Sequence, residues 1–160
     1  MDAQEEMSEL LCGCTPRVAV SAARGYFADR MAAVGDAAVT RLYKDGIGSA
    51  FITAEAAART AIQRGVSKND FARGYGPTCQ RIAVDNLYGR LIFRLWGTAR
   101  RIPYFMNTWR SAIRAESNLP PARQFQRQAL WGIFTGDESY QTIFWRLFNQ
   151  RALWALRPRR

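Results

Sequence analysis

A short apolar run, a Gly-Asp pair and a glycine-opened helix follow one another without a gap between residues 31 and 48. The run from Arg30 to Val34 is too short for a helix and too apolar for an exposed loop, so it predicts a β-strand. Gly35 comes next, and its missing Cβ lets the backbone leave the strand or approach another group closely. Asp36 would then lie at the carboxyl end of the strand, where open α/β sheets bind ligands.

A long helix rich in small residues is predicted to begin at Gly46 and to stop near Gly65. Unpaired N–H groups at the start of such a helix, together with its dipole, favour a bound anion. Gly46 and Gly48 would let that anion approach the backbone closely. The prediction of this helix rests on apolar residues that recur near helical spacing, namely Ile47, Ala50, Phe51, Ala54, Ala58, Ala61 and Ile62.

This segment resembles the C-terminal FAD-contacting motif of NAD(P)/FAD-dependent oxidoreductases, in particular the geranylgeranyl reductase and aromatic hydroxylase-like branch. The likeness covers residues 17–65 and rests on a Gly-Asp-Ala-Ala sequence, a spacer and a Gly-Ile-x-x-Ala helix start. By resemblance, Asp36 binds the ribityl chain, and the amides around Gly46 to Ser49 face the diphosphate and the flavin ring. The cofactor-binding residues that the resemblance implies are Gly35, Asp36, Ala37, Gly46, Ile47, Gly48 and Ser49.

The chain departs from this family in two ways. Relatives often carry a proline in the spacer, whereas residues 42–45 contain none, which leaves the loop conformation open. No Gly-x-Gly-x-x-Gly fingerprint occurs in the sequence, so the adenine half of the cofactor lacks its glycine-rich turn. The expected fold is mainly α with a short β element near residues 17–35. The resemblance implies that this is the C-terminal portion of an α/β FAD-binding fold that lacks the N-terminal Rossmann unit.

The resemblance implies hydride transfer through FAD, with reduction, oxidation or hydroxylation of an apolar substrate. Such a chain would be an enzyme only when an N-terminal half or a partner completes it. A truncated reading frame, a split subunit and a degenerate relative are all open alternatives. A homo-oligomer or a missing N-terminal subunit is the expected partner, because the predicted strand would present unpaired edges. The helix from Gly46 would likewise lose one packing surface.

Charge is distributed unevenly along the 160 residues, and we place a boundary near Gly65. Residues 1–65 hold seven basic and eight acidic side chains, whereas residues 66–160 hold sixteen basic and five acidic ones. All five tryptophans also lie in the second part. The sequence thus divides into a partial FAD-binding segment, residues 1–65, and a basic, Trp-rich helical region, residues 66–160.

The amino-acid composition limits the kinds of catalytic, metal-binding and disulfide chemistry that the chain can carry out. Histidine is absent, which removes the commonest metal ligand and histidine acid/base catalysis, so no metal site is predicted. Three cysteines, an odd number, argue against a disulfide framework. The acidic N-terminus resembles neither a signal peptide nor a transit peptide, and no apolar run reaches transmembrane length. A cytoplasmic location is therefore expected.

Helix-capping and helix-breaking residues divide the second part into several predicted helices. Ser67 and Asp70 can form a capping box, and Gly74 to Pro77 interrupts the helix that follows. Asp85 and Asn86 lie inside the next apolar run, where buried polar groups need partners and can tie this helix to the first part. Further helices are predicted from Pro103 to about Glu116, from Ala122 to about Phe134 with a stop at Gly136, and after a cap at Ser139.

Residues 140–160 form a second candidate for function, a basic amphipathic helix that contains Trp145 and Trp154. Such a helix can lie peripherally on a membrane surface or contact an acidic partner. It can also cover the core of its own domain. The alternative to a flavoprotein is therefore a non-enzymatic basic helical module that binds a membrane surface or a protein. Nucleic acid is disfavoured as a partner because charge alone supports it.

Overall fold

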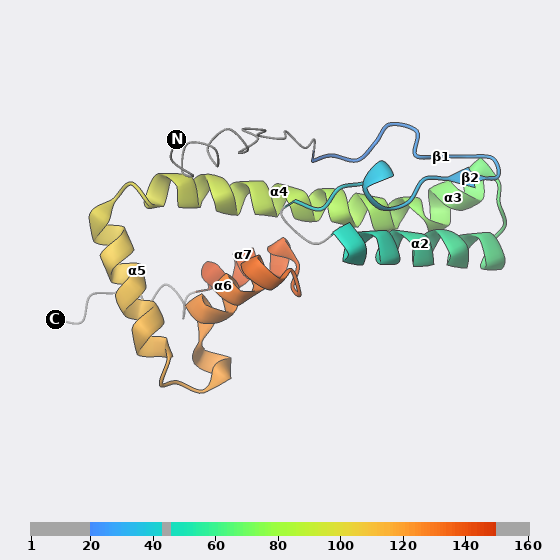
Figure 1. The fold of residues 1–160 in the computed structure, drawn as a ribbon. Helices are drawn as coiled ribbons and strands as arrows, with labels where there is room; N and C mark the ends of the chain where they lie inside the picture. Colours follow the sequence, from blue (N-terminus) through green and yellow to red (C-terminus); the bar gives the residue numbers. More distant parts are fainter. Residues whose placement is uncertain (1–19, 43–45, 150–160) are drawn as a thin grey trace, which may run out of the picture.

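The computed structural model describes residues 20–42 and 46–149, and this part of the chain is mainly helical (Figure 1). A hairpin of two short strands and a 3₁₀ helix precede a series of α-helices, which confirms the expected α-rich class with a short β element. The elements are β1 (Phe27–Ala28), β2 (Met31–Ala32), η1 (Gly35–Ala37), α2 (Gly46–Gln63), α3 (Lys68–Gly74), α4 (Gly76–Ala99), α5 (Pro103–Glu116), η2 (Pro121–Arg123), α6 (Phe125–Thr135) and α7 (Tyr140–Leu147).

The predicted strand from Arg30 to Val34 is wrong in its extent. Strand β2 pairs antiparallel with β1 in the register Phe27–Ala32 and Ala28–Met31. Arg30 has a left-handed φ of 60°, because it lies in the turn of this hairpin and cannot begin the strand. After β2 the chain leaves the hairpin and enters η1, so Asp36 lies in a 3₁₀ helix and not directly at a strand end.

Helix α4 is the longest helix of the described residues, and it contributes to two hydrophobic cores that lie along it (Figure 1). The first core joins the β1–β2 hairpin, α2 and α3 to the N-terminal half of α4, and it contains residues from both sides of Gly65. The second joins α6 and α7 to the C-terminal half of α4. The first core consists of Ala38, Val39, Ala57, Phe71, Tyr75 and Cys79, and the second of Leu42, Ile92, Ala129, Tyr140 and Ile143.

Helix ends are the most accurately predicted feature. Ser67 and Asp70 form the expected capping box, and the Ser139 hydroxyl accepts a hydrogen bond from Thr142 N–H at the start of α7. Gly136 ends α6 with a left-handed φ of 76°. The predicted start of α6 at Ala122 is wrong, because residues 121–123 form η2.

Asn86 is buried and ties α4 to the first part of the chain, as the sequence predicts, whereas the half-buried Asp85 pairs with α7 instead. Asn86 is 2% exposed; its Nδ2 donates to Thr40 O at 2.7 Å, and its Oδ1 accepts from Leu42 N–H at 2.9 Å. Asp85 Oδ1 accepts from Gln141 N–H at 2.9 Å. Helix α4 is thus tied to the loop that precedes α2 and to the start of α7.

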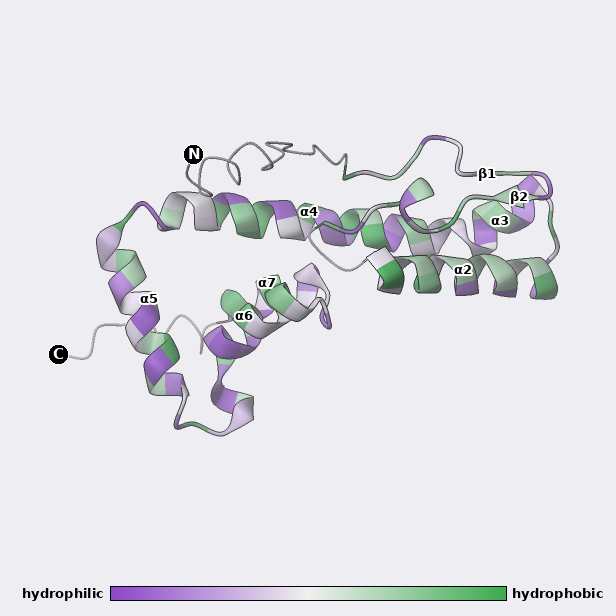
Figure 2. Cartoon of the chain, in the orientation of Figure 1, coloured by the Kyte–Doolittle hydropathy of each residue, from purple (hydrophilic) through white to green (hydrophobic). Residues whose placement is uncertain are grey.

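Hydrophilic residues are interspersed with hydrophobic ones along the labelled helices (Figure 2). Among the described residues, no helix combines the length and the apolar character needed to cross a lipid bilayer.

Gly89 and Gly97 of α4 offer a matched test of the second core. A Cβ at Gly89 would lie 2.8 Å from Tyr140 Cδ2 and 2.9 Å from Leu42 Cδ2, whereas a Cβ at Gly97 would meet nothing within 4 Å. We expect Gly89→Ala to lower the free energy of unfolding by about 1–3 kcal/mol through overpacking. Gly97→Ala should raise it by roughly 0.5–1 kcal/mol through helix propensity. Urea unfolding measures both, and a stabilising Gly89→Ala would contradict the close packing.

Candidate functional site

The seven predicted cofactor-binding residues lie together where η1 packs against the first turns of α2. Gly35 makes this contact possible because it is buried with a left-handed φ of 62°, and an added Cβ would lie 3.2 Å from Ala50 Cβ. Its N–H donates to Thr53 Oγ1 at 2.7 Å. The Gly-Asp motif is therefore held against α2 by a close backbone approach and a buried hydrogen bond.

Small polar side chains form the face of α2 that η1 covers. Thr53 is fully buried, and its hydroxyl donates to Ser49 O at 2.7 Å while it accepts from Gly35. Ser49 is also fully buried, and its hydroxyl donates to Gly46 O at 3.1 Å. The hydroxyl of Ser49 is consequently engaged inside the protein, and only its backbone belongs to the predicted diphosphate site.

The Asp36 carboxylate lies beside the start of α2. A Cβ added at Gly46 would be 3.4 Å from Asp36 Oδ2, so a side chain at position 46 would fill the space next to the carboxylate. Asp36, Ala37 and Gly46 are all exposed. An exposed acceptor beside a glycine-opened helix start can receive hydrogen bonds from a polyhydroxyl chain, and the helix dipole stabilises its negative charge.

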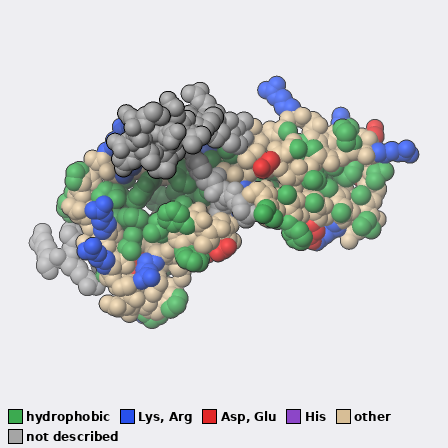
Figure 3. Space-filling model, viewed as in Figure 1, with side chains coloured by type: hydrophobic (Ala, Val, Ile, Leu, Met, Phe, Trp, Pro, Cys, Tyr) green, Lys and Arg blue, Asp and Glu red, His purple; other side chains and the backbone are tan. Residues whose placement is uncertain are grey.

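The apolar stripe of α2 faces outward. Ile47 and Ile62 are each 85% exposed, and Phe51 is 70% exposed. Helical spacing places them on one side of α2, and hydrophobic side chains gather over this end of the molecule in Figure 3. The buried side of the same helix is instead formed by Ser49, Thr53, Ala57 and Thr60.

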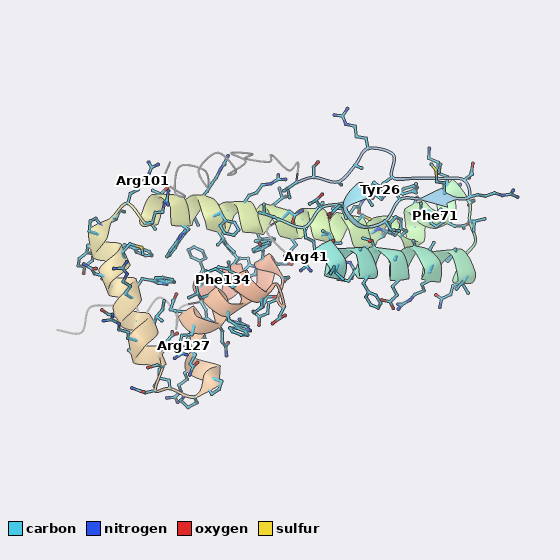
Figure 4. All side chains as sticks on the ribbon, viewed as in Figure 1. Tyr26, Arg41, Phe71, Arg101, Arg127 and Phe134 are labelled. Atoms are coloured by element: carbon cyan, nitrogen blue, oxygen red, sulfur yellow. The ribbon has the colours of Figure 1, made fainter. Side chains whose placement is uncertain are left out.

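Three ionisable residues of the first core have a structural role, namely Tyr26, Tyr75 and Cys79. Tyr75 is fully buried, its hydroxyl donates to Ala33 O at 2.6 Å, and its ring packs edge-on to Tyr26, which Figure 4 labels near β1. Burial raises the pKa of the Tyr75 hydroxyl and of the Cys79 thiol above their ordinary values. Both groups are neutral at pH 7, so Cys79 is a poor nucleophile.

The predicted amphipathic helix after Ser139 is described only as far as residue 149. Within that range α7 buries Tyr140 and Ile143 completely in the second core, and the Tyr140 hydroxyl donates to Leu42 O. Trp145 is 60% exposed. The remainder of the predicted helix, including Trp154, lies outside the described residues.

Sequence reasoning missed an apolar cavity of about 310 Å³ between α4, α5, α6 and the end of α7. Its walls include Trp96, Trp109 and Phe105, and among the described residues that line it Gln126 is the one with a side-chain amide. The concentration of tryptophan after residue 65 was the signal for such a site. Periodicity within single helices does not reveal it, because the cavity depends on how four helices meet.

No protein-family model, curated protein or solved structure matches this chain. Within residues 20–42 and 46–149, no group of three or more Cys, Asp or Glu side chains is placed to hold a metal ion.

Proposed function

We propose that this chain is the C-terminal portion of an FAD-dependent oxidoreductase that acts on an apolar substrate. The observation that carries the proposal is the exposed Asp36 carboxylate beside Gly46, at the start of an 18-residue helix. Gly35 supports it, because a Cβ at this position would lie only 3.2 Å from Ala50 Cβ and its φ of 62° is in the left-handed region that favours glycine. These are the positions on which the sequence motif depends.

Each motif residue has a role in this proposal. Asp36 accepts hydrogen bonds from the ribityl hydroxyls, while amides at the start of α2 and the helix dipole attract the diphosphate. Gly46 keeps open the space that a side chain would fill next to Asp36. The bound flavin would supply the hydride-transfer chemistry, and the protein would position it. The described residues fit the ribityl and diphosphate part; they contain no parallel sheet to support the adenosine half.

The outward apolar stripe of α2 supports a partner for this chain. Isolated exposed apolar residues are ordinary on a protein surface, but three large ones along one helix face form a patch suited to burial. The opposite face of α2 is already occupied by η1. We therefore infer that an N-terminal half, a separate subunit or a second copy of the chain covers Ile47, Phe51 and Ile62. The non-enzymatic alternative lacks a comparable observation, because the apolar face of α7 contributes to the chain's own core.

Replacing Asp36 by alanine tests the cofactor proposal. We expect Asp36→Ala to weaken FAD binding by about 1–3 kcal/mol, because hydrogen bonds to a charged group contribute that much. Glu55→Ala is the matched control, since Glu55 lies on α2, is exposed in an ion pair with Arg59, and carries the same charge. Calorimetric titration of the purified chain with FAD, alone and with any co-purifying subunit, gives the affinities. Equal loss in both variants would reject the ribityl role, and no flavin binding by the parent would reject the cofactor.

A further inference from the structure

The outward face of α2 carries an apolar stripe that runs along most of the helix. Its members are all exposed, and they are Ile47, Phe51, Ala54, Ala58 and Ile62. At about 3.6 residues per turn these positions fall within an arc of roughly 80°. The opposite face packs against η1 and the first core, and Figure 1 shows α2 at the border of the molecule. The described part of the chain therefore leaves a whole helix face open, which differs from a scatter of single exposed residues.

Large side chains occupy the two ends of this stripe, and alanines occupy its middle. Ile47 and Phe51 lie toward the start of α2, and Ile62 lies toward its end. Ala54 and Ala58 lie between them. Two such helices can approach closely at the alanines while their large side chains meet on either side, because the distance between packed helices depends on the side chains at the contact. The shape of the stripe thus suits a second copy of the same helix.

Two opposite charges lie along one edge of the stripe. Glu55 and Arg59 are both exposed and form an ion pair one turn apart. In a parallel pair of α2 helices each charge would face its own counterpart, and like charges across an interface are unfavourable. In an antiparallel pair, Glu55 of each copy can face Arg59 of the other. The charges are therefore complementary in the antiparallel arrangement and repulsive in the parallel one.

The antiparallel register that pairs these charges also pairs the apolar residues. It places Phe51 opposite Ile62 of the second copy. At the centre it places Ala54 opposite Ala58 of the second copy, where small side chains allow the closest approach. A twofold interface requires this kind of self-complementarity, in which residue i contacts residue j and j contacts i. One register thus satisfies the shape and the charge of the stripe together.

We propose that the chain forms a twofold-symmetric dimer in which the α2 helices of two copies pack antiparallel through this stripe. The inference rests on the partner that the proposed function assigns to α2, and it selects a second copy as that partner. The same register covers Ile47 with Val66 of the second copy, a residue that is exposed just after α2 ends. The end of one α2 therefore lies beside the proposed diphosphate site of the other. One helix pair is a small interface, so the dimer should dissociate in the micromolar range.

Analytical ultracentrifugation of the full chain without FAD, from submicromolar to millimolar concentration, measures dimerisation. We expect the parent to be in monomer–dimer equilibrium and Phe51→Asp to weaken the dimer about hundredfold, because it buries a charge in the interface. Phe134→Asp is the matched control, since Phe134 is an exposed phenylalanine of α6, and it should dimerise like the parent. Circular dichroism establishes that each variant is folded. A parent that stays monomeric, or equal weakening by both variants, would overturn the proposal.

Exchanging the charges tests the register without removing an apolar contact. Glu55→Arg and Arg59→Glu should each weaken self-association by about tenfold, because each places like charges opposite one another. An equimolar mixture of the two variants should regain the parental affinity as a mixed dimer. In a parallel dimer like charges already face each other, so neither variant would be weaker than the parent. Unchanged affinity in both variants, or a mixture that does not recover, would contradict the antiparallel register.

Titration with FAD separates this inference from the flavin proposal. A dimer that binds no FAD would reject the cofactor and keep the interface. A monomeric chain that binds FAD would reject the interface and keep the cofactor. A parent that is monomeric alone but joins a co-purifying protein through α2 would also overturn the inference, because another chain would then occupy the stripe.

Discussion

Replacing Asn86 by leucine should lower the free energy of unfolding by about 3–5 kcal/mol. Asn86 is 2% exposed, and its side chain satisfies both Thr40 C=O and Leu42 N–H. Leucine has a similar size but offers neither a donor nor an acceptor, so two backbone groups would be left unpaired inside the protein. Each such group is unfavourable by about 1–3 kcal/mol.

The position of Asn86 between the two cores makes the effect cooperative across the chain. Leu42, whose N–H it binds, belongs to the second core, while Val39 of the same loop belongs to the first. Asn107→Leu on α5 is the matched control, because Asn107 is exposed and the same replacement should change stability by at most about 0.5 kcal/mol. Urea unfolding monitored by circular dichroism measures both variants. Equal stability of the two would show that the Asn86 hydrogen bonds contribute little.

Local chemistry explains which features of the fold can be predicted from the sequence. A capping box requires only that Ser67 and Asp70 stand three residues apart, and a left-handed stop requires only a residue such as Gly136. Both signals lie within one turn of the chain. The hairpin is different, because the extent of β2 depends on β1 as its pairing partner and on the turn at Arg30.

The orientation of α2 could not be predicted from its periodicity. The sequence pattern identifies an apolar stripe with Ile47 and Phe51, but that stripe is exposed and the face with Thr53 is buried. The contact that decides the orientation is the hydrogen bond from Gly35 N–H to Thr53 Oγ1, between residues 18 positions apart. A pattern within one helix cannot report such a contact, nor whether another chain covers the apolar stripe.

The two candidate sites also differ in whether their residues are close together in the sequence. The proximity of the motif residues was predictable because they occupy one continuous stretch, and the structure brings Asp36 beside Gly46. The cavity was not, because its walls come from α4, α5, α6 and α7, which meet only in the folded chain. Polar residues such as Gln126 look like ordinary surface residues when their helix is considered alone.

Glu116 is the second residue whose loss should strongly destabilise the fold, and we expect Glu116→Ala to lower the free energy of unfolding by about 3–4 kcal/mol. Glu116 is 2% exposed and ends α5, and its carboxylate accepts hydrogen bonds from the N–H groups of Gln126 and Arg127. It thereby caps the first turn of α6 from outside that helix, where a negative charge is favoured by the dipole. Hydrogen bonds to a charged group contribute about 1.5–3 kcal/mol each.

Glu116→Gln provides the graded control, because it keeps one acceptor oxygen but removes the charge. It should lose about half as much stability as Glu116→Ala, whereas Glu55→Ala at an exposed ion pair should lose at most about 1 kcal/mol. Hydrogen exchange at the amides of Gln126 and Arg127 should accelerate in Glu116→Ala before global unfolding. Unchanged exchange at these two amides would contradict the capping role. Because Gln126 also orients its side chain against Trp109, the same variant should loosen the wall of the apolar cavity.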